Sequence, residues 1–343
     1  MMPKPSHTNQ GFCASHQKKE IDRSNTNTYC CVLCSSENKI LLCQHDGKTG
    51  AALTSAVCTD CGLVQVVPLP EQQALEAYYS QSYRQDYKKV DVPKLKHVWR
   101  AGNNALLRLP LLEKNTSPGA RILDVGSGGG EFVALLKQRN YQPEGIEPNV
   151  GYGNFARSSY GLPIHLGMLG QVLQNLQPQS YDVITAFHVF EHVNRPATWL
   201  SQIHQLLKPG GVLILEVPNI LHTRCAPNNV FFKAHLFHYS PNTLRAMLAS
   251  QSFSWLDSDT GEQEGIIRMA FRKEQQPDAY FYDRSAEVKK IIEAHEKRTW
   301  FHYLCSIHGL KKFGNRIRQL ILERQLPQQY PDAKQLLSQL YSR

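Results

Sequence analysis

A glycine-rich turn between an apolar run and a helical pattern constrains this 343-residue chain more than any other feature. The apolar run at 121–125 predicts a strand, and Gly126, Gly128 and Gly130 follow it. Residues without a Cβ atom permit a tight turn and let a ligand approach the free N–H groups of the next helix. Glu131 stands where a dinucleotide-binding turn has its last glycine, and its carboxylate would repel a pyrophosphate. The pattern therefore favours a nucleotide-like cofactor that carries no phosphate.

A second acidic anchor follows the turn at the spacing of a βαβ unit. Residues 143–149 read as a short strand that ends in Glu147, twenty-one positions beyond Gly126. An acid at the end of the second strand can accept hydrogen bonds from both hydroxyls of a ribose. The alternative is a solvated loop acid, which the register with the glycine turn disfavours.

The alternation of strands and helices continues to about residue 275. Strands are expected at 163–167, 181–187 and 212–217, with a closing strand at 265–271. Runs that are apolar on both faces are typical of a covered parallel sheet. The sequence Lys-Pro-Gly-Gly at 208–211 is expected to end a helix before the strand at 212. The pattern predicts an α/β fold.

The order of these motifs resembles class I S-adenosylmethionine-dependent methyltransferases. The glycine turn after Asp124, the acid Glu147 and the phrase Leu-Leu-Lys-Pro-Gly-Gly-Val-Leu at 206–213 carry the resemblance. It implies a Rossmann-like sheet and S-adenosyl-L-methionine as cofactor. Many relatives have an acid after the third strand, where this chain has only Met168 to pack on an adenine. The residues expected to bind the cofactor are Asp124, Gly126, Gly128, Gly130, Glu147, Met168, Phe187 and His188.

A histidine lies where such sheets hold their ligands. The segment 188–193 begins at the carboxyl end of the fourth predicted strand. Methyl transfer is an in-line displacement, and a base is needed only when the acceptor must lose a proton. His192 is the candidate base, and the family's Glu-His-Val phrase at this position supports it. The alternative is a histidine that packs beside the following helix.

Two further patterns involve histidines. The letters of His188, Glu191 and His192 also spell the H-x-x-E-H motif of zinc peptidases, but that motif needs a helix, and His188 ends a predicted strand. Relatives carry a stretch similar to 235–244 that covers the acceptor pocket, so His235 or Tyr239 could orient the substrate. A structural histidine under a loop is the alternative.

Two Cys-x-x-Cys pairs near the amino terminus match a zinc site. Cys31 and Cys34 are separated by twenty-three residues from Cys58 and Cys61. Four thiolates from two such pairs fit tetrahedral zinc, and a site filled by sulfur is structural rather than catalytic. Disulfides are the competing interpretation, which nine cysteines and the lack of a signal peptide disfavour.

The residues after the second pair resemble a zinc-ribbon-headed branch of the same methyltransferases. Cys-Gly-Leu at 61–63, Pro-x-Pro at 68–70 and the tyrosines Tyr78, Tyr79 and Tyr83 follow in the order found there. That branch is associated with polysaccharide and modified-sugar biosynthesis. The resemblance implies a small-molecule acceptor, a sugar or a nucleotide- or lipid-linked glycan precursor. The tyrosines could reach the acceptor pocket or belong to a core.

The composition, with 41% apolar and 20% charged residues, is ordinary for a soluble enzyme. No apolar run approaches the roughly eighteen residues of a membrane span. The cofactor domain is of a kind expected in the cytoplasm. The expected division is a disordered tail at 1–28, a zinc ribbon at 29–70, a helical connector at 71–115, a methyltransferase core at 116–275 and a basic helical extension at 276–343.

The carboxyl-terminal extension carries most of the net charge of +9. Residues 284–343 contain twelve Lys or Arg and five Asp or Glu, and their apolar residues follow a helical stripe. Such a helix could lie on the inner face of an anionic membrane, or it could pack its stripe on the core.

Two other function classes remain open at this stage. An RNA methyltransferase could use the ribbon and the basic tail to hold phosphates, but residues 35–57 contain only two Lys, offset by two acids, and no aromatic platform. Nucleic acid is therefore an unlikely partner. A non-catalytic scaffold would not need the intact glycines and Glu147.

Overall fold

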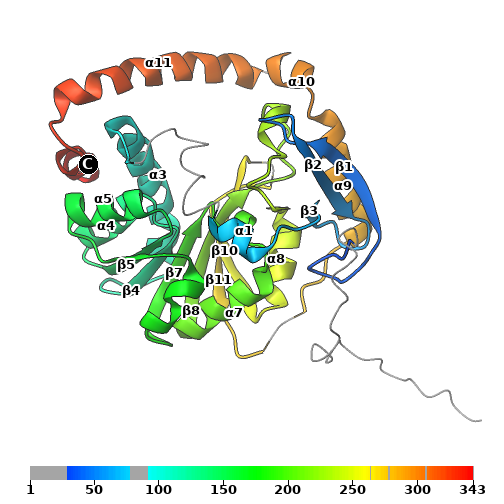
Figure 1. The fold of residues 1–343 in the computed structure, drawn as a ribbon, viewed down its shortest axis with the longest axis horizontal. Helices are drawn as coiled ribbons and strands as arrows, with labels where there is room; N and C mark the ends of the chain where they lie inside the picture. Colours follow the sequence, from blue (N-terminus) through cyan, green and yellow to red (C-terminus); the bar gives the residue numbers. More distant parts are fainter. Residues whose placement is uncertain (1–28, 78–91, 263, 277–278, 306, 343) are drawn as a thin grey trace, which may run out of the picture.

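A seven-stranded sheet forms the centre of the molecule (Figure 1). The computed structural model describes the chain apart from residues 1–28, 78–91, 263, 277–278, 306 and 343. The predicted tail at 1–28 and the three tyrosines Tyr78, Tyr79 and Tyr83 lie outside the described residues. The strand order is β10-β11-β8-β7-β4-β5-β6. Neighbours from β8 to β6 are parallel, whereas β11 is antiparallel to both β8 and β10. Their bounds are β4 Arg121–Val125, β5 Gln142–Glu147, β6 Ile164–Leu166, β7 Tyr181–Phe187, β8 Leu207–Pro218, β10 Phe253–Ser258 and β11 Ile266–Lys273.

Helices cover both faces of this sheet. Because side chains alternate along a strand, Leu123 and Ile184 pack on one face with Trp199, while Ile122 and Val183 pack on the other. The first face is covered by α7 (Pro196–Leu206) and α8 (Pro241–Ala249), and the second by α3 (Leu95–Lys114), α4 (Glu131–Gln138) and α12 (Ala333–Tyr341). Helices α1 (Gln72–Ala77), α5 (Val150–Tyr160) and α6 (Leu169–Val172) complete this part of the chain. The predicted α/β fold with a parallel sheet is confirmed.

The predicted helix stop at 208–211 is part of a strand. β8 begins at Leu207, which pairs with Tyr181, and pairing resumes between Val212 and Val183. The four residues between are therefore an irregularity within β8, and Gly210 adopts a left-handed φ of 70°. The turn residues were identified correctly, but the strand on their amino-terminal side was not expected.

The amino-terminal segment forms a separate antiparallel sheet that includes a strand from the core. Its order is β1-β2-β3-β9, with bounds Lys39–His45, Ala52–Cys58, Val64–Val67 and Phe237–His238. Nearby, Asp46 accepts a hydrogen bond from the Lys233 amide (2.8 Å), and the Gly47 amide donates to the Phe231 carbonyl (2.7 Å). The ribbon is thus joined to the segment that follows β8.

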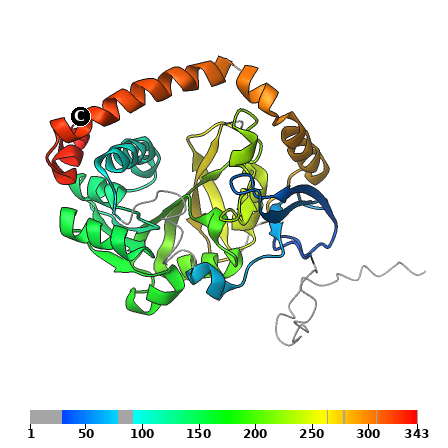
Figure 2. The same cartoon turned by 45° about the horizontal axis from the view of Figure 1, so that its top comes forward.

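The carboxyl-terminal helices cross the molecule from the ribbon side back to α3 (Figures 1 and 2). Helix α11 is fixed near its end by the ion pair of Arg100 with Glu323 (2.5 Å). Helix α12 packs tightly on α3, where a Cβ atom at Gly102 would lie 2.7 Å from Leu340. None of the helices in the described part of the chain is long and apolar enough to cross a membrane. The bounds are α9 Arg284–Lys297, α10 Trp300–Cys305 and α11 Ile307–Gln329.

The predicted apolar stripe of this extension is divided between core and surface. Side chains of α12 and Leu326 are buried against the domain core. In contrast, Trp300 is 51% exposed, and Leu320 and Ile321 are 49% and 55% exposed. The structure therefore supports core packing for the last helix and the end of α11, and leaves Trp300, Leu320 and Ile321 accessible.

Candidate active site

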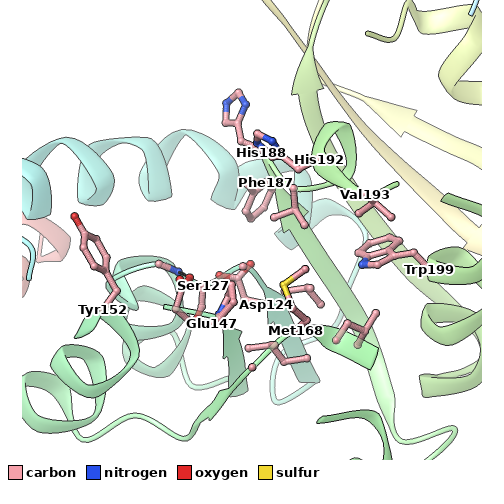
Figure 3. A pocket seen from close by; sticks show the side chains of 18 of the residues that line it. Asp124, Ser127, Glu147, Tyr152, Met168, Phe187, His188, His192, Val193 and Trp199 are labelled. Carbon is pink, nitrogen blue, oxygen red and sulfur yellow. Dashed lines mark hydrogen bonds between the residues drawn. The ribbon is translucent and has the colours of Figure 1, made fainter. Parts of the chain in front are cut away.

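A cavity of about 680 Å³ lies at the carboxyl ends of the parallel strands (Figure 3). This is the edge at which open α/β sheets bind ligands. The glycine turn, the end of β5 and the segment after β7 all contribute to its wall. The predicted site residues that line it are Asp124, Gly126, Gly128, Glu147, Met168, Phe187, His188 and His192.

The glycine turn has the backbone that only glycine adopts without strain. Gly126, Gly128 and Gly130 have φ values of 80°, 58° and 82°. A Cβ atom at Gly126 would collide with Val189, and one at Gly130 would lie 2.7 Å from the Cβ of Ala156. Gly130 precedes α4 directly and does not itself line the cavity. Gly130 instead lets the start of α4 lie close to Ala156 of α5.

Glu147 is fully buried at the end of β5 and is not a solvated loop acid. Its Oε2 accepts a hydrogen bond from the Gly128 amide (2.7 Å), and its Oε1 accepts one from the Asn149 amide (3.0 Å). These two bonds fix the carboxylate against the glycine turn. The register inferred from the sequence therefore places acid and turn in contact.

Asp124 lies beneath the turn. Its Oδ1 accepts a hydrogen bond from the Thr185 hydroxyl (2.7 Å) across β4 and β7. Burial raises the pKa of Asp124 to about 7, although the Thr185 bond acts in the opposite direction. A carboxyl group with this pKa can accept or donate a hydrogen bond near neutral pH.

Apolar and aromatic side chains complete the cofactor end of the cavity. Met168 precedes α6, and Phe187 ends β7 with its ring edge-on to Phe132 (5.0 Å between centroids). Trp199 of α7 and Tyr152 of α5 also line the cavity (Figure 3). The sequence analysis did not identify these two residues, because helical spacing made them indistinguishable from core positions.

His188 is part of an ion-pair network that the sequence did not suggest. It has a left-handed φ of 56°, and its Nδ1 and Nε2 lie 3.3 Å and 3.2 Å from carboxylate oxygens of Glu191 and Glu216. Desolvation opposes protonation, but the two carboxylates outweigh it and raise the pKa of His188 to about 9. Arg108 and Arg268 pair with Glu216 at 2.5 Å and 2.7 Å. These ion pairs join residues that lie far apart in the sequence, so no local sequence pattern could predict them.

His192 lines the cavity, and His235 lies behind it. The Nδ1–H of His192 donates to the Ala234 carbonyl (2.6 Å), which places the lone pair on Nε2. The His235 ring is edge-on to His192 (4.9 Å between centroids) but is not among the residues that line the cavity. Burial lowers the pKa of His235 well below its usual value. Tyr239 is also buried, stacked on Phe190, and does not line the cavity.

The geometry of a zinc peptidase motif is absent from this segment. His188 lies just after β7, and residues 190–192 form a single 3₁₀ turn. The peptidase motif requires both histidines on one face of an α-helix. The interpretation of these letters as a peptidase is therefore excluded.

The four predicted zinc ligands converge. Sγ atoms of Cys31 and Cys61 lie 3.5 Å apart, as do those of Cys34 and Cys58, and all four ligand atoms lie within 4.8 Å of one another. A tetrahedral Zn–S₄ site separates its sulfurs by about 3.8 Å, whereas a disulfide requires about 2.05 Å. The described cysteines are all free thiols, and Cys43 is not part of the group. The donor set thus fits zinc and not a disulfide pair.

Comparison with known proteins gives the domain its family. Residues 96–256 match a family described as a methyltransferase domain. The strand order and the glycine turn agree with it. These residues have the Rossmann-like fold of class I methyltransferases. Its sheet continues beyond the matched range into β11, and the ribbon and the carboxyl-terminal helices lie outside it.

Curated relatives match only part of their length. A ubiquinone biosynthesis O-methyltransferase of Leptothrix cholodnii is 32% identical over 120 residues, which are 33% of this chain and 51% of the relative. Its namesake from Xanthomonas campestris pv. campestris is 34% identical over 106 residues, 30% of this chain and 44% of the relative. The chain thus spans about half the length of the curated relatives it matches.

Solved structures with a similar fold share little sequence. Magnesium protoporphyrin IX methyltransferase from Synechocystis, solved with bound SAH, has a TM-score of 0.44 and 15% identity over 59% of this chain and all of its own. A possible histamine N-methyltransferase from Thermotoga maritima has the same TM-score and 18% identity, with 58% of this chain and all of its own covered.

Proposed function

We propose that this protein transfers a methyl group from S-adenosyl-L-methionine to a small-molecule acceptor. The observation that carries the proposal is the contact between Glu147 and the glycine turn at the wall of a cavity that also contains His192. When bound, the cofactor supplies an electrophilic methyl group. The cavity's volume of about 680 Å³ is in the range of small-molecule sites.

The residues present fit a nucleoside without phosphates. Glu147, held by two backbone amides, would accept hydrogen bonds from the ribose hydroxyls. Met168 and Phe187 would provide apolar contacts for the adenine. The Glu131 carboxylate lies against Gly129, where a Cβ atom would be 2.6 Å from its Oε1, and it would oppose a pyrophosphate.

The acceptor class rests on sequence resemblance. The zinc-ribbon-headed pattern at 29–83 supports a sugar or a nucleotide- or lipid-linked glycan precursor. The names of the curated relatives support oxygen as the methylated atom. We therefore propose a hydroxyl of such a precursor as the acceptor. RNA as the acceptor has no support among the relatives.

His192 is the residue proposed to receive the acceptor's proton. Its Nδ1–H is held by the Ala234 carbonyl, so the Nε2 lone pair can act as a base. His235 packs on the ring and would position it. In His192→Ala we expect turnover to fall roughly a hundredfold or more while cofactor affinity is retained.

The test of this proposal uses calorimetry and labelled cofactor. Wild type should bind S-adenosyl-L-methionine and transfer label to a member of a panel of nucleotide sugars, glycolipids and RNA. His45→Ala, which removes an exposed ribbon histidine, is the matched control and should behave as wild type. Absence of cofactor binding would refute the methyltransferase function, and unchanged turnover in His192→Ala would refute the role of that residue.

We also propose that Cys31, Cys34, Cys58 and Cys61 hold a structural zinc ion. Four sulfur ligands leave no position for water, so the ion would stabilise the ribbon and take no part in methyl transfer.

We further propose a cytoplasmic location, in which the basic carboxyl-terminal extension contacts the inner face of the membrane. The exposed Trp300 and Phe301 support that contact.

A further inference from the structure

Three potential metal ligands meet beside the cavity, apart from the cysteine group. The ligand atoms of Glu191, His192 and His235 all lie within 4.8 Å of one another. The Glu191 Oε1 is 3.7 Å from Nε2 of His192 and 3.9 Å from Nε2 of His235. Ligands bound at about 2.1 Å in tetrahedral geometry are about 3.4 Å apart, so small side-chain movements would complete a site.

The Glu191 carboxylate is buried without full compensation. The residue is 1% exposed, and its Oε2 has no hydrogen-bond partner among the described residues. A buried acceptor without a partner costs free energy, and a buried charge costs more. The Glu191 Oε1 lies 3.3–3.9 Å from imidazole nitrogens of His188, His192 and His235. A cation between Glu191 and the latter two would satisfy the carboxylate.

The histidine next to this carboxylate is oriented as a metal ligand would be. The Nδ1–H of His192 donates to the Ala234 carbonyl at 2.6 Å, which directs the Nε2 lone pair to the Glu191 side. Ligating histidines characteristically donate their other N–H to a carbonyl or carboxylate. The Nδ1 of His188 lies 3.3 Å from the Glu191 Oε1, and this contact helps to orient the carboxylate.

We propose that Glu191, His192 and His235 bind a divalent first-row transition metal ion at the acceptor side of the cavity. Two imidazoles and one carboxylate are a ligand set used by Zn²⁺, Mn²⁺ and Fe²⁺, and three protein ligands leave positions open for an acceptor oxygen. Because only His192 of the three lines the cavity, the ion would lie at its wall.

The proposed function gives this site its chemical role. A bound cation lowers the pKa of an acceptor hydroxyl. The proton passes to solvent, the oxygen's electron pair forms the bond to the methyl carbon, and the pair of the broken C–S bond returns to sulfur. His192 then serves as a ligand, and the cation replaces it as the activating group.

The binding test uses Mn²⁺ followed by electron paramagnetic resonance. Mn²⁺ favours oxygen and nitrogen over thiolate ligands, so the cysteine group does not compete for it. We expect one bound Mn²⁺ per chain in wild type and in His45→Ala. In Glu191→Gln and His235→Ala the affinity should fall at least tenfold, while melting temperature and cofactor affinity show that each variant is folded. Wild type without bound Mn²⁺, or variants that bind it as wild type does, would overturn the proposal.

Cofactor binding measured on the same preparations separates this inference from the proposed function. Cofactor binding without Mn²⁺ binding refutes the metal site alone and leaves His192 as the base. Mn²⁺ binding without cofactor binding refutes the methyltransferase function and retains the site. Mn²⁺ binding with label transfer that rises on its addition supports the metal site and the methyltransferase function, and it replaces His192 by the cation as the activating group.

Discussion

At the scale of single residues, the candidate site depends on backbone groups that orient ionisable side chains. Glu147 is held by the amides of Gly128 and Asn149, and His192 is held by the Ala234 carbonyl. Hydrogen bonds to an ionised group contribute about 1.5–3 kcal/mol each. Preorganised groups of this kind bind a ligand without a further ordering cost.

Substitution of Glu147 tests the ribose contact. In Glu147→Gln we expect the affinity for S-adenosyl-L-methionine to fall about ten- to a hundredfold, because charge-assisted hydrogen bonds to both hydroxyls are weakened. Isothermal titration calorimetry measures the change. Glu113→Gln removes an exposed glutamate at the end of α3 and should leave the affinity unaltered. An affinity within twofold of wild type in Glu147→Gln would contradict the assigned contact.

The limits of sequence reasoning are clearest at this scale. The turn and Glu147 are linked by a fixed βαβ spacing, so their contact could be predicted. Tyr152 and Trp199 lie on helices, where spacing alone does not separate a cavity wall from a core. The contacts of Glu216 with Arg108 and Arg268 depend on the tertiary fold, and no local pattern contains them.

At the scale of elements, the ribbon shares a sheet with the segment that lies behind His192. β3 pairs with β9 through Val64 and His238, and the Val66 amide donates to the Leu236 carbonyl (2.9 Å). The Leu236 amide in turn donates to the Glu191 carbonyl (2.9 Å). The sequence predicted the ribbon but not this connection, because a two-residue strand has no periodicity to detect.

Removal of zinc tests this connection. A strong chelator should release one zinc ion per chain, measured by mass spectrometry of the metal, and hydrogen exchange should accelerate both at 39–67 and at 230–240. Residues 121–147 should stay protected, because they pair within the large sheet. If hydrogen exchange at 230–240 did not change after zinc loss, the inference that the ribbon holds residues 230–240 in place would be wrong.

At the scale of the whole molecule, the carboxyl-terminal helices run along one side of the large sheet, from the ribbon to α3 (Figure 1). The Tyr341 hydroxyl donates to the Glu131 carbonyl (2.8 Å), so α12 contacts the start of α4 beside the cavity. The basic composition of the extension was evident from the sequence. Its division into a buried last helix and the accessible side chains Trp300, Phe301, Leu320 and Ile321 depends on packing against α3.

Vesicle binding tests the accessible portion. We expect the protein to cosediment with vesicles that contain phosphatidylglycerol and not with neutral phosphatidylcholine vesicles, since Arg318 and Arg324 lie near the exposed Leu320 and Ile321. Phe301→Ser with Ile321→Ser should weaken binding about tenfold or more, and His45→Ala should not. Equal sedimentation with both vesicle types, or none with either, would exclude the proposed electrostatic attachment.

The shared strand β9 has an evolutionary consequence. The large sheet carries the residues at the glycine turn and at the end of β5, whereas the small sheet holds the segment behind His192, where His235 packs edge-on to its ring. Changes in residues 39–67 and 230–240 can therefore alter the surroundings of His192 without changing a residue that lines the cavity. By the same reasoning, a chimera that exchanges the ribbon between homologues has to carry both stretches together.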